Sequence, residues 1–265
     1  TLQIVFIAVI FGAALLVLND KTTVVSKVVE QLDYIVQFIM KCLNSFIPLI
    51  IFLSIFNMII KRNSGIGSTA LKPVLLTLMG LAIVIIVYIV IVCVHQQISP
   101  IMLIKKLMPT FIIALTTASS SAAFATNIET CEKKLGIDKK IINFGLPLGQ
   151  SVFMPAAAVL FFSMGICMVE TFQVPITAML LMNLFIIALV LAIAAPPVPG
   201  GFAVCVTILI TQLGIPEAAI PIVIAISMIL DFPCTATNLF CLQAELTDLA
   251  GGLDMLDTEM LRNDS

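Results

Sequence analysis

The chain has 265 residues, of which 61% are hydrophobic and 11% charged, and its mean hydropathy is +1.20. A soluble domain is roughly half apolar and about a quarter charged, so this composition excludes a protein that covers itself with polar surface in water. A net charge of -2 likewise excludes a basic nucleic-acid-binding surface. Lipid is the solvent that fits, and we predict an all-α, multi-pass protein of the cell membrane.

Several runs reach the length of about 20 mostly apolar residues that a spanning helix needs. In chain order, the expected spans are Leu2–Leu18, the later part of Thr23–Ile60, Leu71–Val94, Ile141–Val169 and Ala218–Leu242. The first residue is Thr rather than Met, and no signal-peptide pattern follows, so we expect the chain to be part of a longer protein.

The segment Leu107–Thr130 is flanked on both sides by lysine pairs, which begin at Lys105 and recur after the segment. If it crossed the membrane once, these lysines would lie on opposite sides. If it enters and returns, all of them lie on the cytoplasmic side, as the positive-inside rule favours. We therefore predict a re-entrant helical hairpin with its tip at Ser119, Ser120 and Ser121, because three hydroxyls make a poor lipid-facing surface.

A second interruption occurs at Pro196–Gly201, between the apolar runs Ile176–Ala195 and Phe202–Leu213. Three prolines in four residues cannot continue a helix. We predict a second re-entrant hairpin here. Two broken segments in corresponding positions are typical of transporters built from inverted repeats, because the freed backbone groups hold a solute or an ion near the middle of the membrane.

Asp231 is the one acid inside the last apolar run. A carboxylate near the middle of a span costs about 3 kcal/mol on insertion scales, so it needs a partner. The ammonium group of a bound solute is the interpretation we favour; a proton carrier and a neutral, hydrogen-bonded acid are the alternatives. Thr235 and Asn238 follow at i+4 and i+7, on the same helix face. That stripe fits a polar site, and helix–helix hydrogen bonding is the alternative.

The serines at the first hairpin tip carry the complementary chemistry. Hydroxyls and backbone N–H groups at the end of a half-helix bind anions, so Ser119–Ser121 are candidate ligands of a solute carboxylate. Small residues there also permit close packing, which is the alternative. His95 is the only histidine, and it receives no role.

These landmarks together resemble the dicarboxylate/amino acid:cation symporters, the glutamate transporter family. The resemblance is carried by Thr116–Ala123, Lys134–Lys139, Gly145–Gly149, Val198–Gly201 and the stripe that starts at Leu230-Asp231. It implies a homotrimer in which each protomer moves a transport domain past a scaffold, like an elevator. Residues 1–97 would be the end of the family's helix 4 with helices 5 and 6, residues 98–244 the transport core of hairpin 1, helix 7, hairpin 2 and helix 8, and residues 245–265 an acidic cytoplasmic tail.

The resemblance also implies ligands. For the substrate they are Ser119, Ser120, Ser121, Val198, Gly201, Asp231, Cys234, Thr235 and Asn238. For sodium they are backbone carbonyls of Gly149, Ser151, Ala192, Ile193, Ala195 and Asn238.

Several positions differ from the family pattern, and these differences bear on ion coupling and substrate. Phe153, Pro155 and Ala157 stand where the family has sodium-binding Asn and Asp and a substrate-binding Thr. Leu242 replaces a further sodium-binding Asp, and Cys234 replaces the Arg that pairs with an acidic substrate side chain. We therefore expect a symporter for an amino acid, a neutral zwitterion, coupled to fewer sodium ions, to protons or to no ion, and needing no other cofactor. The alternative is a non-transporting receptor or scaffold of the same family. An enzyme is disfavoured because the chain has no metal-binding cluster of side chains.

Overall fold

The structure is a computed structural model that describes residues 23–44, 66–195 and 200–263, with a few single positions between 7 and 18. The chain divides into two compact units, Thr1–Lys61 and Arg62–Ser265. In the first unit, the described residues form one long helix, α2 (Thr23–Asn44). The second unit contains the remaining elements and all of the candidate site.

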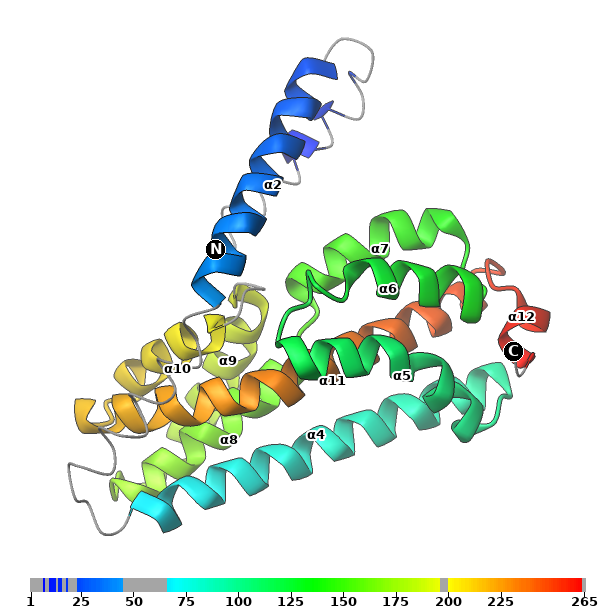
Figure 1. The fold of residues 1–265 in the computed structure, drawn as a ribbon. Helices are drawn as coiled ribbons and strands as arrows, with labels where there is room; N and C mark the ends of the chain where they lie inside the picture. The colour runs from blue at the N-terminus through cyan, green and yellow to red at the C-terminus, as the bar shows by residue number, and fades with distance from the viewer. Residues whose placement is uncertain are drawn as a thin grey trace. The chain divides into compact units, whose positions relative to one another are not determined.

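The described part of the second unit is helical, and an isolated bridge between Ile137 and Leu256 is its only β pairing. Its elements (Figure 1) are α4 (Ile66–Gln96), α5 (Pro100–Thr117), α6 (Phe124–Glu129), the π-helix η2 (Thr130–Lys134), α7 (Lys139–Val152), α8 (Pro155–Thr171), α9 (Ala178–Ala194), α10 (Gly201–Gln212), the 3-10 turn η3 (Glu217–Ala219), α11 (Ile220–Gly252) and α12 (Thr258–Arg262).

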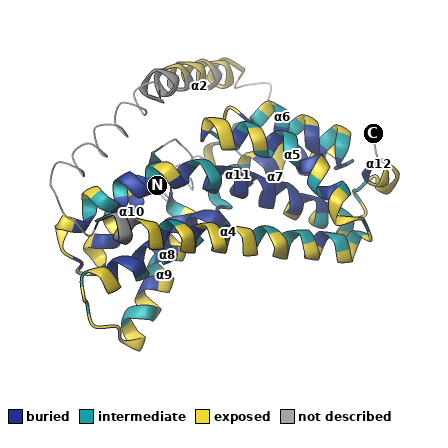
Figure 2. Cartoon of the chain, turned by 60° about the horizontal axis from the view of Figure 1, so that its bottom comes forward, coloured by how far each residue is buried: buried dark blue, intermediate teal, exposed yellow. Residues whose placement is uncertain are grey.

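Helix α11 is the centre of this unit, since it contacts α4, α5, α7, α8 and α10. Two apolar clusters form around it. One joins its first half to α8, α9 and α10, and includes the fully buried Phe161 and Val206. The other joins its second half to α4, α5 and α7, and includes the fully buried Leu107 and Leu146. Figure 2 shows α11 as a mostly buried helix beside the more exposed α4. The polar residues of the α11 stripe lie where the two clusters meet.

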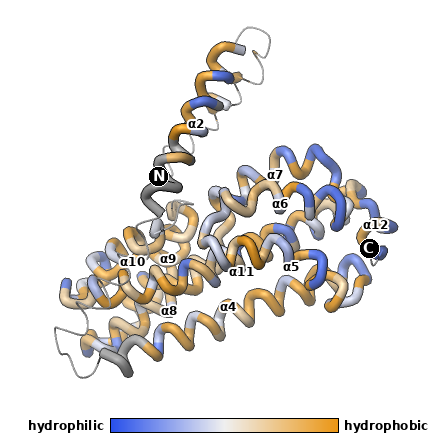
Figure 3. The backbone as a smooth tube through the Cα atoms, in the orientation of Figure 1, coloured by the Kyte–Doolittle hydropathy of each residue, from blue (hydrophilic) through white to orange (hydrophobic). Residues whose placement is uncertain are grey.

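The spanning capacity of the helices confirms a multi-pass membrane protein. Within the described residues, four stretches are long and apolar enough to cross a bilayer: Leu71–Gln96, Pro100–Thr117, Lys139–Thr171 and Glu217–Gly252. Apolar residues run along most of α4 and α8, while hydrophilic residues gather at the α12 end (Figure 3). Helices α5 and α6 with η2 form a helix–turn–helix, and α9 and α10 contact each other. That these pairs are re-entrant stays a prediction, and the tip at 196–199 lies outside the described residues.

The span predicted as one helix over Ile141–Val169 is interrupted. Helix α7 ends at Val152 and α8 begins at Pro155. Proline lacks an N–H and disfavours a helical conformation of the preceding residue, and Met154 accordingly has φ -126° and ψ 64°. The predicted span is confirmed as part of one membrane-crossing stretch, Lys139–Thr171, but Pro155 divides it into two helices, which the sequence prediction did not include.

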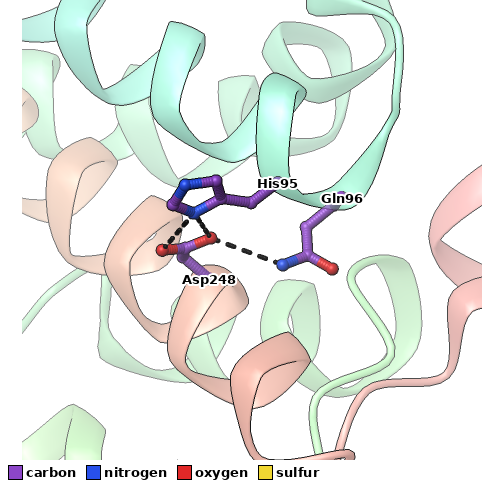
Figure 4. Close-up of polar contacts among 3 residues, drawn as sticks. All are labelled: His95, Gln96 and Asp248. Carbon is purple, nitrogen blue, oxygen red and sulfur yellow. Dashed lines mark hydrogen bonds and ion pairs between the residues drawn. The ribbon is translucent and has the colours of Figure 1, made fainter.

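The last helix runs ten residues beyond the predicted end at Leu242, to Gly252. The additional turns remain buried because Leu246 and Ala250 belong to the second apolar cluster. Polar contacts join them to the end of α4: the Nδ1 atom of His95 lies 2.9 Å from Asp248 Oδ1, and Gln96 Nε2 donates to the same oxygen at 3.3 Å (Figure 4).

The chain then folds back, so that the residues after α11 contact the helical hairpin of α5, α6 and η2. The nitrogen of Asp257 donates to the carbonyl of Gly136 at 2.8 Å. The Nζ atom of Lys106, a residue that is 6% exposed, donates to the carbonyls of Lys134 at 2.7 Å and Met260 at 2.9 Å. Part of the segment expected to be a polar tail is therefore packed structure.

Candidate functional site

A polar cavity lies where three structural breaks meet the middle of α11: the turn after α5, the α7–α8 break and the start of α10. Its volume is about 30 Å³. Its polar lining is Ser120, Gln150, Asp231, Thr235 and Asn238. Its apolar lining is Ala118, Phe153, Met154, Phe202, Leu239 and Leu242. The cavity therefore has one face that carries an acid and hydrogen-bonding groups, and another that is apolar.

Asp231 is 5% exposed, and both of its carboxylate oxygens have partners within the protein. Oδ2 accepts a 2.8 Å hydrogen bond from the backbone N–H of Gly200, which is the N-cap of α10. Oδ1 accepts from the hydroxyl of Thr235 at 3.3 Å. Because the N-terminus of a helix carries free N–H groups and partial positive charge, this arrangement stabilises a carboxylate without a basic side chain.

Asn238 likewise accepts a hydrogen bond from the N-terminus of a second helix. Its Oδ1 atom accepts a 2.9 Å hydrogen bond from the backbone N–H of Ala156 in the first turn of α8. Two residues seven positions apart on α11 thus satisfy the N-termini of two different helices. The predicted Asp-Thr-Asn stripe is brought together at the cavity, and it orients the helix ends around it.

The hairpin tip between α5 and α6 contributes one serine to the cavity. Ala118 takes a left-handed conformation, with φ 48° and ψ 31°, and so ends α5. Of the three tip serines, only Ser120 lines the cavity. Ser119 Oγ accepts from the N–H of Ala122 at 3.2 Å, and the Ser121 carbonyl accepts from the N–H of Phe124 at 3.2 Å, so both help to form the turn.

Gln150 is a site residue that the sequence interpretation missed. Its Nε2 atom donates to the carbonyl of Ser120 at 2.9 Å, which ties α7 to the hairpin tip. An amide side chain within an otherwise apolar segment was the available signal. The apolar lining, including Phe153, Met154 and Phe202, carried no such signal because apolar residues abound throughout the chain.

The other expected substrate ligands lie as follows. Gly201 is a buried first residue of α10, and Val198 lies outside the described residues. Cys234 is fully buried in the first apolar cluster and is absent from the cavity lining. The side chain at this position therefore packs against protein and does not face the cavity in this conformation.

The residues expected to bind sodium through their carbonyls are distributed over α7, α9 and α11. The Gly149 carbonyl accepts from the N–H of Phe153 at 2.8 Å, and the Ser151 hydroxyl donates to the Pro147 carbonyl at 3.0 Å. Ala192 and Ala195 are buried at the end of α9, whereas Ile193 is 47% exposed. The side chain of Leu242 lies directly on Gly149, so closely that a Cβ atom on Gly149 would overlap it.

The side chains around this position supply few free oxygen atoms. Leu242 offers no oxygen, Phe153 offers none, and the Asn238 oxygen is already bound to α8. Sodium is a hard cation that needs several oxygen ligands, so the side chains around Gly149 do not fit it. No cluster of three His, Cys, Asp or Glu side chains that would hold a metal occurs among the described residues.

The fold and the site define a class: an α-helical, multi-pass membrane protein whose polar cavity is assembled from interrupted helices. The model of the sodium:dicarboxylate symporter family matches residues 1–242, and the chain belongs to this family. The chain is 27% identical over 140 residues to the human "Neutral amino acid transporter A", a match that covers 53% of this chain and 26% of that protein. It is 26% identical over 167 residues to the "L-cystine uptake protein TcyP" of Bacillus cereus, covering 62% of this chain and 36% of that protein.

These matches cover about a quarter to about a third of the length of the curated relatives. The family and these relatives are transporters, which confirms the prediction that the protein is not an enzyme.

Proposed function

We propose that this chain forms part of a symporter that carries a neutral, zwitterionic amino acid across the membrane. The observation that carries the proposal is the two-sided cavity. Asp231 and Thr235 offer oxygen atoms to an ammonium group, and the first hairpin tip with Gln150 offers polar groups to a carboxylate. The remaining lining is apolar and contains neither Lys nor Arg, so it matches a side chain without charge.

The names of the relatives support the same substrate class. One is a neutral amino acid transporter and another takes up cystine, and both substrates are zwitterions without net side-chain charge at neutral pH. Serine hydroxyls and amide groups recognise the ammonium and carboxylate groups that such substrates share, and the apolar lining discriminates between substrates by their side chains.

Substrate binding requires the cavity to enlarge. A volume of about 30 Å³ holds one or two water molecules and not an amino acid. The hydrogen bond from Gly200 to Asp231 is the contact that an ammonium group would replace. We propose that the start of α10 moves away from Asp231 when the substrate enters, and that the helices around α11 then move together, as an elevator mechanism within a homotrimer requires.

Sodium coupling is reduced in this proposal. Leu242 on Gly149, and Phe153 and Pro155 at the helix break, offer no side-chain oxygen at positions where the family resemblance implies sodium ligands. The oxygen atoms that remain for sodium are backbone carbonyls near the ends of α7 and α9, and these could bind at most one ion. A proton on Asp231 is the other candidate for coupling.

One observation favours the alternative of a non-transporting receptor or scaffold. Both carboxylate oxygens of Asp231, the hydroxyl of Thr235 and the Oδ1 atom of Asn238 already have partners within the protein, so these groups are satisfied without a solute. A relative that had lost transport would retain such packing.

Thermal unfolding of the purified full-length protein, with a panel of neutral amino acids and dicarboxylates, tests the proposal. A neutral amino acid is expected to raise the melting temperature, and Asp231→Asn to abolish the shift. Asp248→Asn, the same change on the same helix but outside the cavity, is expected to keep it. Uptake into proteoliposomes with a sodium gradient, a proton gradient or neither then identifies the coupling ion. Binding without flux supports the receptor, and no binding by any amino acid refutes the zwitterion site.

A further inference from the structure

A long apolar groove lies between α4, α8 and α9, separate from the polar cavity. Its volume is about 580 Å³, and it shares no lining residue with the cavity. Helix α8 contacts both α4 and α9, so α8 is the floor and the other two helices are the walls. Ser163 is the one polar residue in its lining. Among the side chains that line it are Leu76, Met79, Ile83, Phe162, Phe185 and Leu189.

The groove is open toward the surroundings of the protein, because its wall residues remain exposed. Met79 on α4 is 64% exposed and Phe185 on α9 is 53% exposed. At the floor, Gly80 lies so close to Val159 that a Cβ atom there would collide with it. Hence α4 and α8 meet at that point, and the space above them stays unfilled by the described side chains. In a membrane, such a space faces hydrocarbon.

A pair of opposite charges marks one end of the groove. Lys72 and Glu170 form an ion pair between the start of α4 and the end of α8, and their side chains are 58% and 57% exposed. Lys72 precedes the groove residue Leu76 by one helical turn, and Glu170 follows the groove residue Ile166 by one turn. Residues four apart lie on the same helix face, so both charges lie above the groove and not behind it.

The charge pair also marks the depth of the groove in the membrane. Lys72 stands at the beginning of the candidate span Leu71–Gln96, and Glu170 stands at the end of Lys139–Thr171. Long charged side chains at helix ends extend to the headgroup region. From there, the groove follows α4 from Leu76 to Ile83 into the apolar zone, a distance of about 10 Å at 1.5 Å per residue.

We propose that this groove binds a phospholipid with a zwitterionic headgroup, whose phosphate contacts Lys72, whose ammonium group contacts Glu170, and whose acyl chain lies along α8. A headgroup with both charges can replace both partners of the Lys72–Glu170 pair, whereas an anionic headgroup bound to Lys72 would leave Glu170 without a cation. The apolar lining and the inward direction from the charge pair fit an acyl chain that is anchored at its polar end.

The test uses tryptophan fluorescence, since the 265-residue sequence contains no tryptophan. Met79→Trp places a reporter in the groove wall, and Leu78→Trp places one at nearly the same depth on the opposite face of α4, where Leu78 is 41% exposed. Each full-length variant, with any tryptophan elsewhere in the protein replaced, is reconstituted in unlabelled bilayers. It is then titrated with phosphatidylcholine that carries bromine on its acyl chains, and with brominated diacylglycerol, which has no charged headgroup.

At the groove reporter, brominated phosphatidylcholine is expected to bind about fivefold more tightly than brominated diacylglycerol. At the reporter on the opposite face, the two lipids are expected to quench equally well. Adding Lys72→Met to the groove reporter is expected to remove most of that preference. This exposed substitution leaves the apolar lining intact. Equal quenching by both lipids at both reporters would show that only ordinary boundary lipid occupies the groove, which would overturn the proposal. A groove reporter that neither lipid quenches would mean that a protein segment covers the groove, which also overturns it.

Discussion

The contact between Leu242 and Gly149 offers the sharpest test of how the region around the cavity is built. Leu242 is 3% exposed, and its side chain lies where a methyl group on Gly149 would have to fit. Gly149→Ala alone should overpack this site and destabilise the protein by about 1–3 kcal/mol. Leu242→Ala alone should cost about 2 kcal/mol, the lower end for a buried leucine, because lipid is as apolar as the protein interior and only the packing contribution is lost.

The double variant distinguishes this geometry from mere burial. With Leu242→Ala in place, the new methyl group at position 149 enters the vacated space, so the two costs should not add. We expect the combined loss to be smaller than the sum by about 1–2 kcal/mol, as measured by reversible unfolding in mixed detergent micelles. Costs that add to within about 0.5 kcal/mol would show that the two residues do not touch, and the inference that Leu242 packs directly on Gly149 would be refuted.

Other predictions follow from individual contacts. Asn238→Leu leaves the N–H of Ala156 without its acceptor and should destabilise the protein by about 1–3 kcal/mol in the same unfolding assay. Lys106→Met removes two hydrogen bonds to carbonyls and should increase amide hydrogen exchange in residues 253–263 well before exchange in α8 increases; equal change in both would contradict a local role. Gln150→Leu should weaken substrate binding about tenfold by freeing the hairpin tip at Ser120, while Gln173→Leu, at a position outside the cavity, should leave the affinity unchanged.

Sequence reasoning reached the helical class and the polar stripe because both depend on local patterns. Composition and run length require lipid-spanning helices, and spacing at i, i+4 and i+7 places Asp231, Thr235 and Asn238 on one face whatever surrounds them. What the stripe contacts could not be predicted in this way. The partner residues Gly200 and Ala156 lie 31 and 82 positions away in the sequence, and only the fold brings them to α11.

The difference between local sequence patterns and contacts that depend on the fold also explains the errors. Pro155 was compared with a family ligand, and its direct consequence for the backbone, the interruption between α7 and α8, was overlooked. The polar composition of residues 245–265 predicted an aqueous tail, although Leu246 and Ala250 have the spacing of a buried helix face. Gln150 was missed since a single polar residue in an apolar run has many possible partners, and its contact with Ser120 depends on the turn after α5.

Helix ends are the common element of the candidate site, and this has a consequence for how an ion or a solute would act there. The N-termini of α8 and α10 both point at side chains of α11, so the field at the cavity is positive without any basic residue. A carboxylate at position 231 offsets that field while the cavity is closed. In the proposed binding mode, an ammonium group that displaces Gly200 from Asp231 leaves the N–H groups at the start of α10 without their acceptor, and these groups would then join the first hairpin tip and Gln150 in binding the substrate's carboxylate. A zwitterion satisfies both demands at once, whereas a simple amine or a simple acid satisfies one. Binding should therefore require both charged groups on the same molecule, and amines or carboxylic acids added separately or together should not raise the melting temperature as the amino acid does.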